Sequence, residues 1–297
     1  MRLRPLEALN FATLAVLALL TLALHGRLSD PGAILLRYAE MAAGLAVIAA
    51  AARNEAKLPA TARFVLNFYP MAFIPILYES LGPLIVAANP VARDALLLAA
   101  DRALFGTDPT VWLERFLSPF LTDLFFLAYL SYYFIAIALG AVLWKRKPAE
   151  AKRFIFTLTV AYLISYAGYF LVPALGPRVS LANRHGQFLA TTAISRTVSV
   201  TLDELEHTKF DVFPSGHTMI AVVVLVVSFQ RARDAFWWLL PIGVLLIIST
   251  VYCRFHYVVD LIAGTVLALA AVPIGDRLYE RWNGRSKVQG PRSKVGI

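Results

Sequence analysis

Long apolar runs separated by short polar segments dominate the chain from residue 8 to residue 275. A helix that crosses a bilayer needs about 20 mostly apolar residues. Runs of suitable length fall at 8–24, 34–52, 64–80, 121–143, 154–173, 214–230, 236–253 and 257–275. The pattern therefore predicts an all-α integral membrane protein with about eight transmembrane helices, the third of them kinked by Pro70 and Pro75.

Two segments interrupt this pattern. In residues 81–120, Asp94 and Asp101 break up a leucine-rich stretch, which indicates a helix that lies in the membrane interface with turns after it. Residues 174–213 form the longest polar stretch and are predicted to be a loop. We expect three parts: an N-terminal pair of helices with its loop at 1–63, a six-helix core at 64–280, and a basic tail at 281–297 that is disordered after Arg281.

Composition supports a membrane protein. Hydrophobic residues make up 59% of the 297 residues, charged residues only 16%, and the mean hydropathy is +0.66. Because a soluble domain averages about 25% charged residues, this chain lacks the polar surface that water requires. The net charge of +9 is explained by basic loops that face anionic lipid, so no nucleic-acid partner is expected. A single cysteine, Cys253, excludes an internal disulfide.

The basic residues predict an orientation. Threading eight spans in order places 18 of the 28 Lys and Arg residues on one side. That side holds the N-terminus, 53–63, 144–153, 230–235 and the residues after 275. By the positive-inside rule it is cytoplasmic, with both termini there. The segments at 25–33, 81–120, 174–213 and 253–256 then face outward. A plasma or inner membrane location is expected.

Three groups of reactive residues share the predicted outer face, although they are far apart in sequence. The first contains Arg178, where the fifth span ends. The second is Ser215-Gly216-His217, where the sixth begins. The third runs from Arg254 through His256 to Asp260, where the eighth begins.

These residues can carry out phosphoryl transfer. Ser215 can cap a helix, and Gly216 allows a ligand to approach the free N–H groups of a helix start, which bind phosphate. Arg178 and Arg254 can add bidentate hydrogen bonds to phosphoryl oxygens. His256 and Asp260 are spaced i, i+4, so a carboxylate can orient a nucleophilic imidazole. His217 can protonate the leaving oxygen.

Other functions fit parts of this set. A histidine and an aspartate at membrane depth also suit a proton relay in a lipid or ion transporter. Two histidines and an aspartate could ligate zinc, but the nearby arginines favour an anion over a cation. Because arginines can supply the positive charge, no metal or other cofactor is expected.

The motifs also carry a family resemblance. FPSGHT followed by a helix, and then H-x-x-x-D at 256–260, resembles the type 2 phosphatidic acid phosphatase superfamily. The resemblance covers about 64–275 and implies a six-helix catalytic core. It further implies a phosphohistidine on His256, His217 as the acid and Asp260 as the residue that orients the nucleophile.

Departures from the family pattern concern the arginines and the acceptor. Leu171 stands where the first motif has Lys, and Thr250 stands where the third has Arg. The string STVYCRFHYVVDLIAG and LFG-x-x-P at 104–109 look more like the branch that contains inositol phosphorylceramide synthase. The resemblance implies a metal-independent lipid phosphatase or phosphotransferase. Its substrate is a membrane lipid phosphate, and its acceptor is water, an alcohol or a lipid hydroxyl.

Overall fold

The structure, a computed structural model, describes residues 3–189, 192–205 and 208–288. Within these ranges every regular element is a helix. The α-helices are α1 Pro5–Ala23, α2 Pro31–Ala52, α3 Ala60–Phe68, α4 Pro70–Tyr78, α5 Leu81–Ala88, α6 Asp94–Phe105, α7 Pro109–Trp112, α8 Pro119–Leu130, α9 Tyr132–Arg146, α10 Pro148–Leu171, α11 Pro177–Ser180, α12 Ala193–Leu205, α13 Gly216–Arg231, α14 Arg233–Tyr252 and α15 Val258–Val288. Three short 3-10 helices join them: η1 His25–Arg27, η2 Glu55–Lys57 and η3 Leu113–Phe116.

The structure confirms an all-α protein of the membrane type. Six helices are long and apolar enough to cross a bilayer: α1, α2, α3 with α4, α10, α14 and α15. The fourth expected span is a pair, α8 and α9, bent by 50° and able to count as a seventh crossing. The sixth expected span, α13, has only 16 residues. All eight apolar runs are therefore helical, but two are bent or short.

Proline accounts for the break inside the third span. α3 ends at Phe68 and α4 begins at Pro70, so the helix is interrupted where the proline ring fills the place of a backbone N–H donor. Pro75 lies inside α4 without ending it.

Three expectations need correction. The predicted loop at 174–213 contains α11 and the 13-residue helix α12. The predicted interfacial segment at 81–120 holds three α-helices and one 3-10 helix, because Gly106 and two prolines stop each helix early. The tail does not begin at residue 281, since α15 continues to Val288. The rest of the predicted tail lies outside the described residues.

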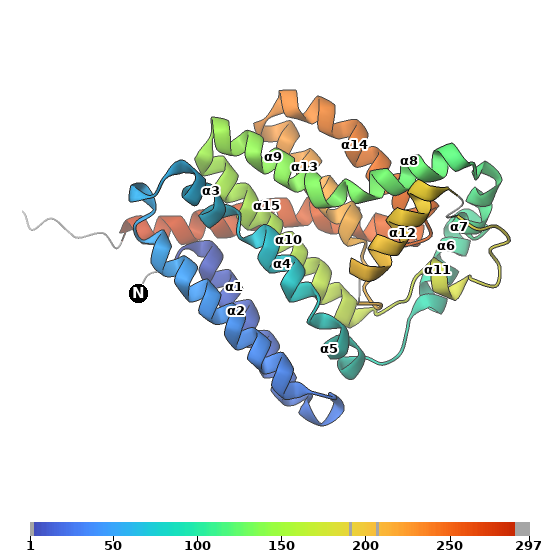
Figure 1. Cartoon of the computed structure of the whole chain (residues 1–297), viewed down its shortest axis with the longest axis horizontal. Coiled ribbons are helices and arrows are strands. Elements are labelled where there is room, and N and C mark those ends of the chain that lie inside the picture. The colour runs from blue at the N-terminus through green and yellow to red at the C-terminus, as the bar shows by residue number, and fades with distance from the viewer. Residues whose placement is uncertain (1–2, 190–191, 206–207, 289–297) are drawn as a thin grey trace, which may run out of the picture.

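The core of the molecule is a bundle of α9, α10, α13, α14 and α15. Its buried side chains include Leu139, Phe154, Val223, Leu246 and Ala268, one from each helix. Figure 1 shows α1 and α2 side by side as an arm at one edge of this bundle, while α6, α7, α11 and α12 gather at the opposite end. This helical cap lies at the end where α15 begins.

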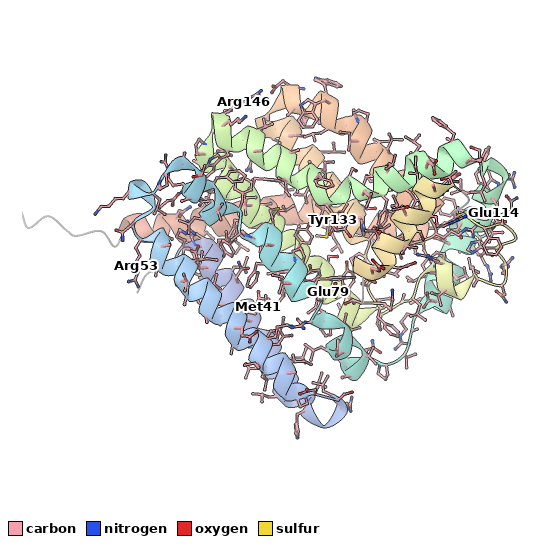
Figure 2. All side chains as sticks on the ribbon, in the orientation of Figure 1. Met41, Arg53, Glu79, Glu114, Tyr133 and Arg146 are labelled. Carbon is pink, nitrogen blue, oxygen red and sulfur yellow. The ribbon has the colours of Figure 1, made fainter. Side chains whose placement is uncertain are left out.

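The labelled residues of the loops assigned to opposite sides of the membrane lie toward different ends of the molecule. Figure 2 labels Arg53 and Arg146, from two of the basic loops, on the left and upper side, and Glu114 at the far right. At the basic end, Asp276 of α15 accepts a hydrogen bond from Arg153 Nε of α10 at 2.7 Å and forms an ion pair with Arg231 of α13. These two contacts join the three helices. Which end faces the cytoplasm stays a prediction.

Gly275 tests the packing of α10 against α15. A Cβ at this position would lie 2.8 Å from the Cα of Thr157, a contact that side chains cannot make without moving a helix. We expect Gly275→Ala to lower the free energy of unfolding by about 1–3 kcal/mol, the usual cost of overpacking. Thermal unfolding of the purified protein in detergent measures this change.

Gly44 provides the matched control. It lies in α2, and a Cβ there would have no heavy atom within 4 Å. Gly44→Ala should leave stability unchanged or raise it, because alanine favours the helix. Equal thermal shifts for the two variants would contradict the close contact between α10 and α15.

Candidate active site

The first catalytic candidate, His217, lies in the first turn of α13. Ser215 caps this helix, and its hydroxyl accepts a hydrogen bond from the N–H of Thr218 at 3.2 Å, as the motif predicted. Gly216 also has a packing role. A Cβ there would lie 2.7 Å from the Tyr169 hydroxyl, so the glycine makes room for a tyrosine of α10.

The second candidate, His256, lies in the loop that joins α14 to α15. The N–H groups of Phe255 and His256 both donate to the carbonyl of Thr250, which folds the loop tightly at the end of α14. The Nδ1 atom of His256 is 2.9 Å from the carbonyl oxygen of Val212. Because a carbonyl can only accept, Nδ1 carries the hydrogen and Nε2 keeps its lone pair. The imidazole is therefore held in the tautomer that a nucleophile needs.

Asp260 lies close to this histidine, but not by the helix-face geometry that the sequence suggested. α15 begins at Val258, so His256 precedes the helix and the i, i+4 argument does not apply. The Oδ2 atom of Asp260 is 3.5 Å from Nδ1 of His256 and accepts a hydrogen bond from the N–H of Tyr257 at 2.8 Å. The other oxygen, Oδ1, is buried without a partner among the described residues. Asp260 therefore also fixes the loop that carries His256.

Two further carboxylates, both on α6, hold the same loop. Asp101 is 1% exposed, and its oxygens accept hydrogen bonds from the N–H groups of Val258 and Val259 at 2.9 and 2.8 Å. Asp94 accepts from the N–H groups of Leu175 and Gly176. It also accepts from the Tyr257 hydroxyl at 2.9 Å.

Sequence reasoning treated Asp94 and Asp101 as interruptions of an apolar stretch. Their spacing of seven residues, which puts both on one helix face, was the available signal. In an apolar segment such a pair marks a buried polar contact.

The two histidines lie beside each other. Their ring centroids are 5.7 Å apart, and the rings of Tyr129 and Tyr132 flank His217 at 4.3 and 4.1 Å. The Nε2 atom of His217 is buried without a hydrogen-bond partner among the described residues. An unsatisfied buried nitrogen is costly in a folded protein, so it points to a ligand or a reacting group.

Direct contact between α13 and α15 fixes the spacing of the histidines. The N–H of Ser215 donates to the carbonyl of Asp260 at 3.1 Å. A Cβ at Gly264 would lie 2.7 Å from the Ser215 carbonyl. Glycine at 264 thus lets the helix starts that carry the histidines touch through backbone atoms.

The arginines are placed differently from the sequence expectation. Arg178 pairs with Asp203 at 2.9 Å, and Arg254 pairs with Glu114 at 2.7 Å. Both line a cavity of about 410 Å³, here called the arginine cavity, together with Cys253. His217 does not line it.

Aromatic rings separate the arginine cavity from the histidines. The Arg178 guanidinium lies 5.5 Å from the ring centroid of Phe255. The ring of Phe255 stacks on Tyr129 at 4.5 Å, and Tyr129 lies against His217. The structure thus brings together His217, His256, Asp260, Ser215 and Gly216, but places Arg178 and Arg254 in the wall of a different cavity.

His217 lines a second cavity, of about 320 Å³. We call it the tyrosine cavity, because six tyrosines line it: Tyr78, Tyr132, Tyr133, Tyr162, Tyr166 and Tyr169. Its other lining residues include the carboxylate of Asp211 and the apolar side chains of Met71, Ile74 and Ile137. The cavity therefore combines polar groups with apolar side chains of α4 and α9.

Burial sets the protonation state of His256. The loss of hydration lowers its pKa to about 4, while the charge of Asp211 and the Val212 carbonyl act in the opposite direction. The imidazole is therefore neutral at neutral pH. Among the described residues, no three His, Cys, Asp or Glu side chains group as metal ligands would.

Comparison with known proteins identifies the family. The sequence model of the PAP2 superfamily matches residues 95–274, which is more than half of the chain. The chain belongs to the PAP2 superfamily. The matched region runs from α6 into α15 and contains His217, His256 and Asp260. It starts later than the expected residue 64, so α1 to α5 lie outside it.

One curated relative is a PA-phosphatase related-family protein of Dictyostelium discoideum. The two chains are 26% identical over 184 residues, which are 54% of this chain and 33% of the relative. The match thus spans about a third of the length of that PAP2-related protein. No solved structure matches the chain.

Asp101 provides a local test of this geometry. In Asp101→Asn only one side-chain oxygen remains to accept hydrogen bonds from Val258 and Val259. Because a buried hydrogen bond to a charged group contributes about 1.5–3 kcal/mol, amide exchange in this loop should accelerate about ten- to a hundredfold. Hydrogen–deuterium exchange with mass spectrometry of the peptide around 253–262 measures it.

Asp30→Asn is the matched control. Asp30 caps α2 through the N–H of Ala33 at 2.8 Å, far from the histidines. Asparagine keeps one side-chain oxygen for this cap, so the variant should leave the exchange of the 253–262 peptide unchanged. Unaltered exchange of that peptide in Asp101→Asn would show that α6 does not hold the loop.

Proposed function

We propose that this PAP2 protein is a membrane lipid phosphatase or phosphotransferase that works through a phosphohistidine on His256. Membership of the superfamily supports a phosphatase-type lipid function and favours it over the transporter alternative. The observation that carries the mechanism is the Val212 carbonyl on Nδ1 of His256, which leaves the lone pair of Nε2 beside His217.

The reaction has two balanced steps. In the first, Nε2 of His256 attacks phosphorus and forms a P–N bond. The P–O bond to the lipid breaks, and His217 gives its proton to the departing alkoxide. In the second, water or an alcohol hydroxyl attacks phosphorus and gives its proton to His217. The P–N bond then breaks and restores neutral His256.

Asp260 has a secondary electrostatic role. When His256 attacks, its ring gains positive charge, and the carboxylate at 3.5 Å favours that charge. The Val212 carbonyl keeps the Nδ1 hydrogen in place during this step. The two oxygens together orient the ring and stabilise the phosphorylated form.

The helix start at Ser215–Gly216 is the proposed phosphate cradle. Its N–H groups carry the partial positive charge of a helix N-terminus. Arg178 and Arg254 are the further phosphate ligands that we propose, but each is paired with a carboxylate. For Arg254 to reach a phosphoryl oxygen it must exchange Glu114 for the substrate. Because these cationic groups supply the charge, we expect turnover to be independent of added metal and unaffected by EDTA.

The tyrosine cavity gives a lipid a route to the histidines. Met71, Ile74 and Ile137 suit an acyl chain, while Asp211 and His217 add polar groups to the lining. The site would take its lipid from the bilayer, on the extracytoplasmic side of a plasma or inner membrane. The sequence likeness to the inositol phosphorylceramide synthase branch supports an alcohol or lipid hydroxyl as acceptor, in competition with water.

Phospho-enzyme trapping tests the nucleophile. His256→Ala should abolish acid-labile labelling from a ³²P-labelled lipid phosphate and reduce turnover by more than about a thousandfold, because no other residue supplies the attacking nitrogen. Rapid quench followed by gel autoradiography at alkaline pH measures the label.

His217→Gln is the matched control. It should still be labelled when the leaving group needs no proton, as with a nitrophenyl phosphate, but only weakly by a lipid alkoxide substrate. Persistent labelling of His256→Ala would contradict the assignment of His256 as the nucleophile.

The pH dependence follows from the buried imidazole. His256 must be neutral to attack, and burial lowers its pKa to about 4, so the neutral form persists to unusually low pH. We expect kcat/KM to be bell-shaped, with an acidic limb below the ordinary histidine value of about 6.5. A phosphodiester substrate avoids titration of the substrate itself. An acidic limb above that value would contradict the buried, neutral nucleophile.

A further inference from the structure

The tyrosine cavity has an unusual wall of aromatic rings. α10 contributes Tyr162, Tyr166 and Tyr169, whose spacing of four and three residues puts them on one helix face. Neighbouring rings lie 5.8 to 6.2 Å apart. Tyr132 lies 6.5 Å from Tyr162 and 4.1 Å from His217, which continues the wall to the histidine.

The hydroxyl groups of these tyrosines already have protein partners. Tyr78 donates to Asp211, and Tyr166 donates to the carbonyl of Ile74 at 3.3 Å. Tyr169 accepts from Ser165 at 2.9 Å, and Tyr162 is hydrogen bonded to Tyr132. A guest therefore meets ring faces more than free hydroxyl groups.

The charged residues of this cavity are acidic. Glu79 and Asp211 line it, and no lysine or arginine belongs to its described lining. The arginine cavity shows the opposite charge, with Arg178 and Arg254 in its wall. Figure 2 labels Glu79 at the end of α4 and Tyr133 on α9, above it in this view.

Burial affects one of these acidic side chains, Asp211. Loss of hydration raises the pKa of Asp211, and the hydrogen bond from the Tyr78 hydroxyl acts in the opposite direction. A phosphate dianion would raise it further, whereas a cation would lower it. The negative ring faces and the carboxylates of Glu79 and Asp211 together favour an organic cation.

We propose that the tyrosine cavity binds an organic ammonium group of the substrate, next to the phosphoryl group on the histidines. The ammonium group would belong to the head group of a phospholipid donor, of the choline or ethanolamine kind, or to an amino-alcohol acceptor. An uncharged polyol fits less well, because it needs hydrogen-bonding groups that the tyrosine hydroxyls have committed to the protein. The inference deepens the proposed function, on which its place in the reaction rests.

Its volume suits such a guest. At about 320 Å³ the cavity is near the lower end of the ligand pockets of proteins, which span roughly 300–1,000 Å³. That space accommodates a small head group and the first part of a chain, with the ammonium among the rings and the chain along Ile74 and Ile137.

Equilibrium binding to full-length His256→Ala in detergent separates recognition from turnover. The probes are lysophosphatidylcholine, lysophosphatidylethanolamine, lysophosphatidylinositol and lysophosphatidic acid with one acyl chain, titrated calorimetrically. We expect the two ammonium lipids to bind about tenfold or more tighter than the inositol lipid, the effect of a desolvated cation–π contact. Equal affinities, or a preference for inositol, would overturn the proposal.

Second-site variants locate the ammonium group. Glu79→Gln and Asp211→Asn should reduce the ratio of choline to inositol affinity severalfold. Glu204→Gln, an exposed change on α12, should leave the ratio unchanged. Tyr162→Phe keeps a ring and should retain the preference, whereas Tyr162→Leu should lose it. The opposite result, loss in Tyr162→Phe, would indicate hydroxyl recognition and overturn the proposal.

Turnover by the unsubstituted protein tells the two sources apart and tests the proposed function independently. Release of diacylglycerol from phosphatidylcholine or phosphatidylethanolamine supports the donor. Formation of phosphocholine or phosphoethanolamine from phosphatidic acid and the free amino alcohol supports the acceptor. Selective ammonium binding without any turnover would support the cavity assignment and refute the proposed reaction. Turnover without ammonium selectivity would support the proposed reaction and refute the cavity assignment.

Discussion

The candidate site depends on the hydrogen bonds between α6 and the start of α15. The first N–H groups of any helix lack partners within the helix, and in an apolar surrounding they must find acceptors elsewhere. Asp101 supplies two such acceptors, one each for the N–H groups of Val258 and Val259, directly after the loop that carries His256. Asp94 binds the chain at Leu175 and Gly176 in the same way. A short helix outside the bundle thus fixes the position of the proposed nucleophile.

From this anchor the remaining geometry follows by close backbone contact. His256 is held by the Val212 carbonyl, three residues before the start of the motif that carries His217. The N–H of Ser215 donates to the Asp260 carbonyl, and Gly264 leaves no side chain between the helices. The two histidines are therefore set by main-chain atoms, which cannot change rotamer, and only their rings project toward a substrate.

Charge is divided on either side of the histidines. Arg178 and Arg254 line one cavity and carboxylates line the other, with Phe255 and Tyr129 between them. Such a separation suits a zwitterionic or diester substrate better than a simple phosphate, since opposite charges on one molecule would find opposite walls. The bent pair α8 and α9 and the short helix α13 lie in this region, and α9 and α13 contribute residues to the tyrosine cavity.

The sequence by itself determined the class of fold, the helices of the apolar runs and the motifs that contain the two histidines. Each apolar run of about 20 residues has to satisfy its own backbone hydrogen bonds in a bilayer, so helix is the only local solution and no distant partner is needed to predict it. The break before Pro70 and the cap at Ser215 are local for the same reason.

Only the tertiary structure decided which residues contact one another. Asp101 of α6 looked like an interruption because its partners are 157 and 158 residues away. Nothing in the sequence shows that Asp203 and Glu114 pair with Arg178 and Arg254. The tyrosines of α10 looked like ordinary span residues until α4 and α9 enclosed them. These contacts depend on the packing of distant segments, and a hydrophobic pattern records the burial of each residue but not the identity of its neighbour.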